Sequence, residues 1–170
     1  MAIQFRPLGN ENRAAFSCGQ QALDLWFHLR AGQEQRNKVA QVFVAHDDKL
    51  GIVGFYSLSA FSIVAADLPK EVVRKLPRYD TIPAVLLGRM ARDLRVRGTG
   101  MGAALMGDAI TRIVAASAEM GICAIVVDAK TPELAKYYQD YGFIPFPSQP
   151  LRPFFPLATA VKSLDQATQS

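Results

Sequence analysis

The fold of this chain is decided by one stretch, Val96-Arg97-Gly98-Thr99-Gly100-Met101-Gly102-Ala103. Its three glycines stand at alternate positions between a predicted strand over 84–96 and a predicted helix that runs to Met120. Glycine lets backbone N–H groups point into one concavity, and the start of a helix adds unpaired N–H groups and the positive end of its dipole. The stretch therefore predicts a cradle for an anion such as a pyrophosphate. A tight strand-to-helix turn without a ligand is the alternative.

Two other phosphate-binding motifs fit the stretch less well. Gly98, Gly100 and Ala103 satisfy the Gly-x-Gly-x-x-Ala fingerprint of dinucleotide-binding folds. In those folds the fingerprint follows the first strand, whereas here it follows three or four predicted strands. A P-loop would end in Gly-Lys-Ser/Thr, which the stretch lacks.

The hydropathy pattern outside this stretch predicts a mixed α/β protein. Alternating and continuous apolar runs predict strands, while 3.6-residue spacing and the positions of proline and glycine predict helices. Strands are expected over 2–7, 39–46, 50–66, 84–96, 122–128 and 154–161, and helices over 20–30, 68–76, from the glycine turn to 120, and over 131–141. Residues 77–83 are expected to be irregular, residues 144–147 to form a proline-rich loop, and the residues from about 162 to form a frayed polar tail. Gly121 is expected to end the helix before it as a left-handed cap. This order of elements excludes a barrel and a sandwich.

Length and composition indicate one folded domain. The chain has 170 residues, of which 50% are hydrophobic and 20% charged. These values exclude a disordered tail, a fibrous repeat and a disulfide scaffold, and the length suits a single domain over 1–170. No stretch resembles a signal peptide or a membrane span, so a cytoplasmic protein without a membrane partner is expected. Of the two cysteines, Cys18 is expected to lie in a turn and Cys123 to be a buried small hydrophobic residue.

The formal charge of +4 comes from one segment of the chain. Residues 70–97 contain eight basic and three acidic residues, a net charge of +5, and the rest of the chain contains 11 basic and 12 acidic residues, a net charge of −1. Such clustering favours a patch that binds a polyanion, and a solvated basic face explains the charge about equally well.

Two motifs resemble those of the GCN5-related N-acetyltransferases. Arg97, Gly100 and Gly102 match the family's Arg/Gln-x-x-Gly-x-Gly/Ala signature, and residues 135–143, Ala-Lys-Tyr-Tyr-Gln-Asp-Tyr-Gly-Phe, resemble its FYxxxGF helix one strand downstream. The resemblance implies a mixed, mostly antiparallel central sheet flanked by helices. It also implies that acetyl-coenzyme A is the co-substrate, without a metal, with its pyrophosphate on the turn and its pantetheine arm on the preceding strand. The cofactor-binding residues would be Met90, Ala91, Arg92, Arg97, Gly98, Thr99, Gly100, Met101, Gly102 and Ala103.

Further stretches resemble one subfamily, the acetyltransferase toxins of bacterial toxin–antitoxin pairs. They are residues 16–19, 23–26, 35–37, 54–59, 76–79, 82–91 and 153–157, so the similarity covers the chain from about Phe5 to Val161. The resemblance implies transfer of acetyl to the α-amino group of an aminoacyl-tRNA, which blocks translation. It also implies a homodimer and a ribbon-helix-helix antitoxin as partner. One departure is Thr131, where many family members have an asparagine that contacts the cofactor; threonine caps a helix equally well.

The chemistry of such a transfer points to Tyr138 as the catalytic residue. A free α-amino group has a pKa of about 8 and esterification of the neighbouring carboxyl lowers it, so a strong base is dispensable. The departing thiolate needs a proton, which a tyrosine hydroxyl can donate as general acid. Tyr138, four residues before Gly142, is the candidate, with packing on an amphipathic helix as the alternative. For Tyr137 and Tyr141 packing is the favoured interpretation.

The basic segment then predicts the acceptor. The acceptor stem of tRNA is the anion we expect, contacted by Arg74, Lys75, Arg78, Arg89 and Arg95. For any single arginine, an ordinary surface ion pair is the alternative. Asp93, beside the turn, is expected to bond loop N–H groups rather than to act as a base. The competing functions are acetylation of a small-molecule or protein amine, and a non-catalytic subunit that binds antitoxin or nucleic acid.

Overall fold

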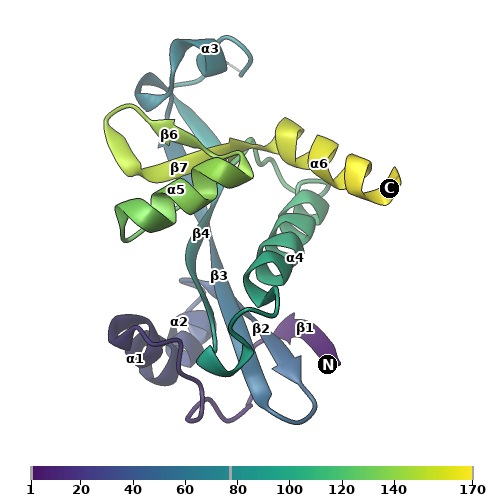
Figure 1. Cartoon of the computed structure of the whole chain (residues 1–170). Coiled ribbons are helices and arrows are strands. Elements are labelled where there is room, and N and C mark those ends of the chain that lie inside the picture. The colour runs from purple at the N-terminus through teal and green to yellow at the C-terminus, as the bar shows by residue number, and fades with distance from the viewer. Residues whose placement is uncertain (1, 77, 170) are drawn as a thin grey trace. The chain divides into compact units, whose positions relative to one another are not determined.

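The computed structural model describes residues 2–76 and 78–169. Within this part of the chain the elements are, in order, β1 (Ile3–Pro7), α1 (Gln21–Leu29), α2 (Ala31–Arg36), β2 (Gln41–Asp47), β3 (Gly51–Val64), the 3₁₀ turn η1 (Ala65–Asp67), α3 (Lys70–Val73), β4 (Thr81–Arg92), the 3₁₀ turn η2 (Leu94–Val96), α4 (Met101–Ala116), β5 (Ala124–Val127), α5 (Pro132–Tyr141), β6 (Ile144–Phe146), β7 (Gln149–Pro156) and α6 (Leu157–Gln169) (Figure 1).

The strands belong to one sheet of mixed direction. Their order is β1-β2-β3-β4-β5-β7-β6. β1 with β2, β2 with β3, β5 with β7 and β6 with β7 pair antiparallel, whereas β4 pairs with β5 in parallel. Parallel neighbours need a long crossover connection, and α4 lies in the chain between these two strands. The expected mixed, mostly antiparallel sheet with helices is confirmed.

The chain divides into two compact units, which we call the first and the second unit. The first consists of Met1–Ser59 and Gly88–Ala109, and the second of Ala60–Leu87 and Ile110–Ser170. The single domain expected over 1–170 stays a prediction.

An aromatic cluster under α1 forms the core of the first unit. Phe27 is fully buried and stacks on Phe55 with the ring centroids 4.2 Å apart, and Phe16 meets both rings edge-on. Such offset and edge-on arrangements are the favoured contacts between aromatic rings. The cluster holds α1 and the segment before it against β3.

The second unit is built around β5 and β7. β5 is buried along its whole length, as its unbroken Ala-Ile-Val-Val sequence predicts. α5 lies along β7 (Figure 1). It begins as predicted, because the Thr131 hydroxyl accepts a hydrogen bond from the N–H of Leu134 and Pro132 occupies the first helical turn. It ends at Gly142, whose φ of +124° suits glycine.

The sequence-based expectation is wrong at the C-terminus. The last strand ends at Pro156 instead of extending over 154–161, residues 144–146 form a short strand instead of a loop, and the tail from Leu157 is helical to Gln169. Leu157, Ala160 and Val161 have the i, i+3, i+4 spacing of a helix, and the fully buried Ala160 provides its packing contact.

Two other boundaries also differ from expectation. α4 ends at Ala116 instead of Met120, and Gly121 is not among the glycines with positive φ, so it does not form the left-handed cap that its position suggested. The expected strand over 84–96 begins earlier, at Thr81, and ends at Arg92, because Asp93 starts a 3₁₀ turn. Pro77, where an irregular segment was expected to begin, lies outside the described residues. In the described part of the chain, no helix has the length and hydropathy to cross a membrane.

Candidate active site

The glycine turn has the backbone conformation that only glycine adopts without strain. Gly98 and Gly100 have φ values of +78° and +86° and precede the first residue of α4, Met101. A Cβ at Gly98, Gly100 or Gly102 would have no atom within 4 Å, so the space above these three positions is open. The turn therefore presents bare backbone to its surroundings.

The backbone N–H groups of this turn are available to a ligand. Among the described residues, none accepts a hydrogen bond from the N–H of Gly98, Gly100 or Gly102. The Thr99 hydroxyl donates to the carbonyl of Val96 at 2.6 Å, which holds the exposed turn in shape. Met101 is buried and anchors the first turn of α4. Open space, free N–H groups and a helix start together make an anion cradle, and the residues present fit a pyrophosphate.

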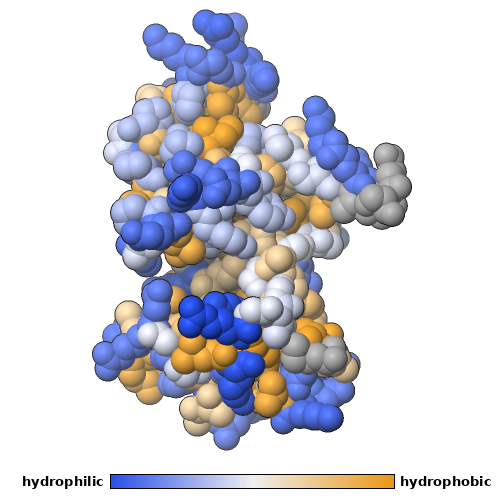
Figure 2. Space-filling view, in the orientation of Figure 1, coloured by the Kyte–Doolittle hydropathy of each residue, from blue (hydrophilic) through white to orange (hydrophobic). Residues whose placement is uncertain are grey.

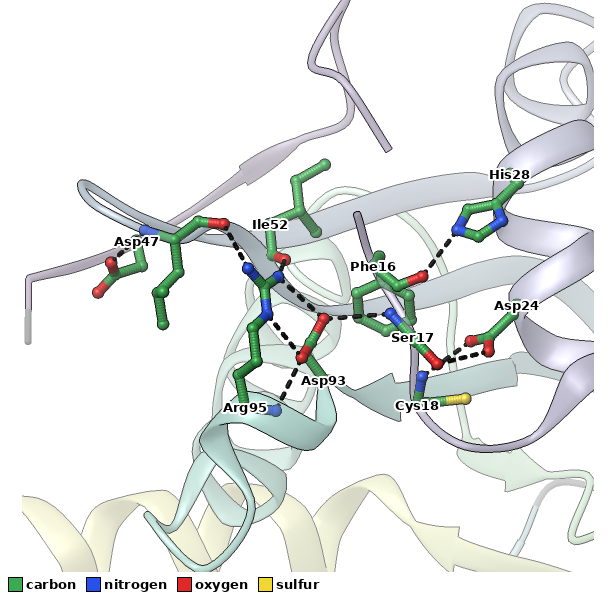
Figure 3. Close-up of polar contacts among 10 residues, drawn as sticks. Phe16, Ser17, Cys18, Asp24, His28, Asp47, Ile52, Asp93 and Arg95 are labelled. Carbon is green, nitrogen blue, oxygen red and sulfur yellow. Dashed lines mark hydrogen bonds and ion pairs between the residues drawn. The ribbon is translucent and has the colours of Figure 1, made fainter. Parts of the chain in front are cut away.

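Asp93 organises the entry to this turn (Figure 3). Its side chain is 2% exposed and accepts four hydrogen bonds, from the N–H of Ser17 at 3.1 Å and from the N–H, Nε and Nη2 of Arg95 at 2.8, 2.9 and 2.9 Å. Burial alone would raise the pKa of Asp93, but the bonds from Arg95 and Ser17 outweigh it and lower the pKa. The expectation that Asp93 bonds loop N–H groups is confirmed, and a carboxylate so fully bonded has no free oxygen for a base.

Arg95 is bound into the same network. Besides the ion pair with Asp93, its guanidinium donates to the carbonyls of Leu50 at 3.2 Å and Ile52 at 3.4 Å. The hydrogen bond to Asp93 raises the pKa of Arg95. The structure thus shows Arg95 engaged with the fold, and its role toward tRNA stays a prediction.

The segment before α1 is fixed to the turn by the same set of contacts (Figure 3). Asp24 accepts from the N–H of Cys18 at 2.8 Å and the hydroxyl of Ser17 at 3.0 Å, and Nε2 of His28 lies 2.8 Å from the carbonyl of Phe16. Burial, with Asp24 nearby, raises the pKa of the Cys18 thiol to about 11. A thiol of that pKa is a poor nucleophile at neutral pH. Cys18 lies in the irregular segment before α1, and the turn expected there is not assigned to it.

The end of β4 carries the residues expected to meet the pantetheine arm. β4 pairs with β5 from Ala84 to Leu87, and Met90, Ala91 and Arg92 lie beyond that paired segment. The N–H of Arg89 donates to the buried hydroxyl of Ser57 on β3 at 3.0 Å. Met90, Ala91 and Arg92 are therefore not paired with β5, and their role toward the pantetheine arm stays a prediction.

The residues that contact Arg89 could not be predicted from the sequence. Its guanidinium lies 4.4 Å from the centroid of the Trp26 ring, and the indole N–H of Trp26 donates to Glu34. Ser57 and Trp26 come from β3 and α1, so no local spacing pairs them with Arg89. The sequence signal was weak, because Ser57 is one of three serines in β3 and nothing distinguishes it from the other two.

Tyr138 lies in the second unit, on α5. The residue is 5% exposed, with its ring 5.3 Å from Phe143 and 5.5 Å from Tyr137 between centroids. No described residue bonds its hydroxyl, and no fully buried side-chain polar atom in the described chain lacks a partner, so the hydroxyl itself reaches the surface. Burial, with Tyr137 nearby, raises the pKa of Tyr138 to about 12. Tyr138 is therefore a protonated phenol at neutral pH, with its ring packed and its hydroxyl accessible. Tyr137 and Tyr141, expected to pack, are each more than 40% exposed.

The predicted tRNA-contacting residues fall on both units. Arg74, Lys75 and Arg78 follow α3 in the second unit and are exposed, and no described residue forms an ion pair with them. Figure 2 shows strongly hydrophilic residues covering the tip around α3. Arg89 and Arg95 belong to the first unit and are engaged with Trp26 and Asp93. Exposed cations without an ion-pair partner are better placed to bind a polyanion than cations already bound to other side chains.

Known proteins with similar sequences identify the family. The chain is 37% identical to "Probable toxin TacT" of Sinorhizobium fredii over 161 residues, which span 90% of this chain and 88% of that protein. It is 36% identical to the "tRNA-acetylating toxin" of Mycobacterium tuberculosis over 137 residues, 81% of each. The chain belongs to the acetyltransferase toxins of the GCN5-related N-acetyltransferase family. No protein-family profile matches the chain.

Solved structures of one such toxin, AtaT, have the same fold. AtaT complexed with acetyl-methionyl-tRNAfMet is 28% identical with a TM-score of 0.86, and the match covers 98% of this chain and 99% of that one. AtaTR bound with AcCoA is 27% identical with a TM-score of 0.83, covering 95% and 98%. A Tyr→Phe variant of AtaT bound to the C-terminus of the antitoxin AtaR is 25% identical with a TM-score of 0.82, covering 98% and 99%. These three AtaT structures contain, respectively, an acetylated aminoacyl-tRNA, acetyl-CoA and part of an antitoxin.

Proposed function

We propose that this toxin transfers acetyl from acetyl-coenzyme A to the α-amino group of an aminoacyl-tRNA and thereby blocks translation. The observation that carries the proposal is the glycine turn at Gly98–Gly102, open and with unbonded N–H groups, in a chain related to a tRNA-acetylating toxin. The AtaT complex with acetyl-methionyl-tRNAfMet supports the same acceptor class.

The turn is proposed to bind the coenzyme. The N–H groups of Gly98, Gly100 and Gly102 would hold the pyrophosphate, with Arg97 and Thr99 at its edge and Met101 and Ala103 at the start of α4. Met90, Ala91 and Arg92, beyond the segment of β4 that pairs with β5, would hold the pantetheine arm by their backbone. Asp93 positions the turn without touching the ligand.

The proposed catalytic residue is Tyr138. Bound acetyl-coenzyme A supplies an acetyl thioester. The neutral α-amino nitrogen forms a bond to the acetyl carbon as the carbon–sulfur bond breaks, and the amine proton is lost to solvent. The Tyr138 hydroxyl donates its proton to the leaving sulfur and regains one from water. Its pKa of about 12 supports this role, because the phenol is fully protonated wherever the amine is reactive.

The acceptor tRNA is proposed to lie on the basic residues. Arg74, Lys75 and Arg78 are exposed and unpaired among the described residues, so they can neutralise phosphates at no cost in broken ion pairs. Arg89, stacked on Trp26, would contact the acceptor end of the tRNA. Arg95, already paired with Asp93, would contribute mainly through the long-range electrostatic potential of its charge.

The assembly follows the same family pattern. We propose a homodimer of single-domain protomers, neutralised by an antitoxin of the ribbon-helix-helix type. The AtaT–AtaR structure supports an antitoxin partner. Because acetyl-coenzyme A and charged tRNA are cytoplasmic molecules in bacteria, the cytoplasm is the proposed site of action.

Acetylation of a charged tRNA pool tests the proposal. Purified protein is incubated with labelled acetyl-coenzyme A and aminoacyl-tRNA, and the amino acid released from the tRNA is analysed by mass spectrometry. Label is expected on the α-amino nitrogen with wild-type protein and a loss of about 100-fold in kcat with Tyr138→Phe, since general acids contribute 10²–10⁴-fold. Tyr137→Phe is the matched control, because Tyr137 directly precedes Tyr138 in α5 and its side chain is half-exposed. If label appears on a small amine or a protein but on no aminoacyl-tRNA, the proposal is refuted and acetylation of a small-molecule or protein amine takes its place.

A further inference from the structure

A second anion site is indicated by a cleft in the first unit, far in sequence from the glycine turn. The cleft has a volume of about 320 Å³ and lies between the segment after β1 and the helix α2. Leu8, Gly9 and Asn10 form one wall, and Gly32 of α2 lies on the other side with an arginine on each flank. None of these residues belongs to the proposed coenzyme site.

Two guanidinium groups converge in this cleft over Gly32. A Cβ placed on Gly32 would lie 3.0 Å from Nη1 of Arg13 and 3.2 Å from Nη1 of Arg36. The two nitrogens are therefore separated by no more than the sum of these distances, 6.2 Å. Like charges repel at this range, so their convergence favours an anion between them. The absence of a side chain at Gly32 leaves room for both.

The charges around the pair leave the cleft positive. Glu11, the acidic residue of the lining, accepts from the N–H of Gly9 at 2.7 Å and forms an ion pair with Arg6 at 3.3 Å. Burial would raise the pKa of Glu11, but these bonds and the charge of Arg6 lower it, so Glu11 stays ionised and is neutralised by Arg6. Arg13 and Arg36 have no carboxylate partner among the described residues.

The cleft is held in shape before any ligand binds. Gln35 donates from Nε2 to the carbonyl of Leu8 at 2.7 Å and accepts from the N–H of Val42 at 2.8 Å, so it ties α2 to the segment after β1 and to β2. Arg13 donates from Nη2 to the carbonyl of His28 at 3.3 Å and lies over the ring of Phe27, which leaves its Nη1 on the cleft side. A site whose walls are fixed in advance loses little entropy on binding.

We propose that this cleft binds a phosphate group of the acceptor tRNA backbone. The inference rests on the proposed function and adds to it a phosphate subsite that lies outside the basic segment 70–97. A backbone phosphate is the anion that the proposed acceptor tRNA supplies, and its two non-bridging oxygens can accept charge-assisted hydrogen bonds from both guanidinium groups. Phosphate contacts of this kind position a nucleic acid without reading its sequence.

Steady-state acetylation of aminoacyl-tRNA by Arg36→Gln tests the subsite. The KM for aminoacyl-tRNA is expected to rise about tenfold, because one charged hydrogen-bonded contact is lost, while kcat and the KM for acetyl-coenzyme A stay constant. The slope of log affinity against log salt concentration should fall by about 1. Arg30→Gln is the matched control, since Arg30 is exposed at the end of α1 and lies outside the cleft.

A second variant removes the subsite without removing charge. Gly32→Ala places a methyl group against both guanidinium ends, so the tRNA KM should rise although alanine is the better helix former and the thermal stability should not fall. An aminoacyl ester without phosphates should be acetylated equally by wild type and both variants.

The outcomes separate this inference from the function on which it rests. If wild-type protein acetylates no aminoacyl-tRNA, the proposed function fails. If it does, and Arg36→Gln and Gly32→Ala leave the tRNA KM and the salt slope unchanged, the phosphate subsite is refuted. A loss of antitoxin binding in both variants with tRNA kinetics unchanged would refute it too, and would assign the cleft to a protein carboxylate.

Discussion

Replacing Asp93 by asparagine should loosen the entry to the glycine turn at a predictable cost in stability. The carboxylate accepts four hydrogen bonds of 2.8 to 3.1 Å while 2% exposed. Asparagine keeps one oxygen, which can accept two of them, and turns an N–H₂ toward the other two donors. Each lost bond costs about 1 kcal/mol, so we expect a loss of about 2 kcal/mol in the free energy of unfolding. The ion pair itself adds little, because the Arg95 side chain is 37% exposed and solvent screens it.

The pH dependence provides an independent check of the same substitution. The pKa of Asp93 is lowered in the folded protein, so its charged form contributes stability above the unfolded-state pKa of about 3.9 and that contribution is lost as the pH falls through the folded pKa. Asp93→Asn removes the titrating group. The stability difference between wild type and variant should therefore be largest at neutral pH and shrink below pH 4.

Urea unfolding at pH 7 and at several acidic pH values measures both quantities. Asp48→Asn is the matched control, because Asp48 is an exposed acid in the β2–β3 turn, and it should change stability by less than about 0.5 kcal/mol. The KM for acetyl-coenzyme A should rise in Asp93→Asn alone. A variant as stable as wild type, or a difference that does not depend on pH, would refute the claim that this carboxylate organises the turn.

Four further predictions test separate parts of the structure. Gly100→Ala should lose about 1–2 kcal/mol of stability, from its φ of +86°, and raise the KM for acetyl-coenzyme A, whereas Gly121→Ala, where φ is not positive, should do neither. The rate of acetyl transfer should rise with the amine's deprotonation up to about pH 8 and then stay level to pH 11, because Tyr138, with a pKa of about 12, remains protonated; a fall between pH 9 and 11 would contradict its role. Cys18 should resist alkylation at pH 8 in the native protein and react after unfolding, as peptide mapping would show, since its pKa is about 11. Thr131→Ala should cost about 1 kcal/mol in thermal unfolding and Thr131→Ser much less, because serine keeps the hydroxyl that caps α5.

The local features of the site could be predicted because each depends on a few neighbouring residues. The glycine turn, the cap at Thr131 and the end of α5 at Gly142 follow from backbone preferences of glycine, threonine and proline that act within four or five residues. The family motifs at 97–102 and 135–143 coincide with these local features. The mixed sheet and the relation to acetyltransferase toxins were accordingly accessible from sequence.

Other features required the folded chain. Asp93 bonds to Ser17, 76 residues away, and Arg89 lies on Trp26, so neither partner is marked by spacing along the sequence. Charge counting placed Arg95 in a binding patch, whereas its guanidinium is already bound to Asp93 and two carbonyls.

By itself, then, the sequence determined most of the elements before residue 144, the glycine turn, the family and the candidate proton donor Tyr138. Only the tertiary structure decided which charged groups are free. It pairs Arg95 within the fold, leaves Arg74 and Arg78 exposed, and brings Arg13 and Arg36 together over Gly32. The physical reason is range: backbone preferences act between neighbours in the chain, whereas the state of a charge depends on every group that packing brings within a few ångströms of it.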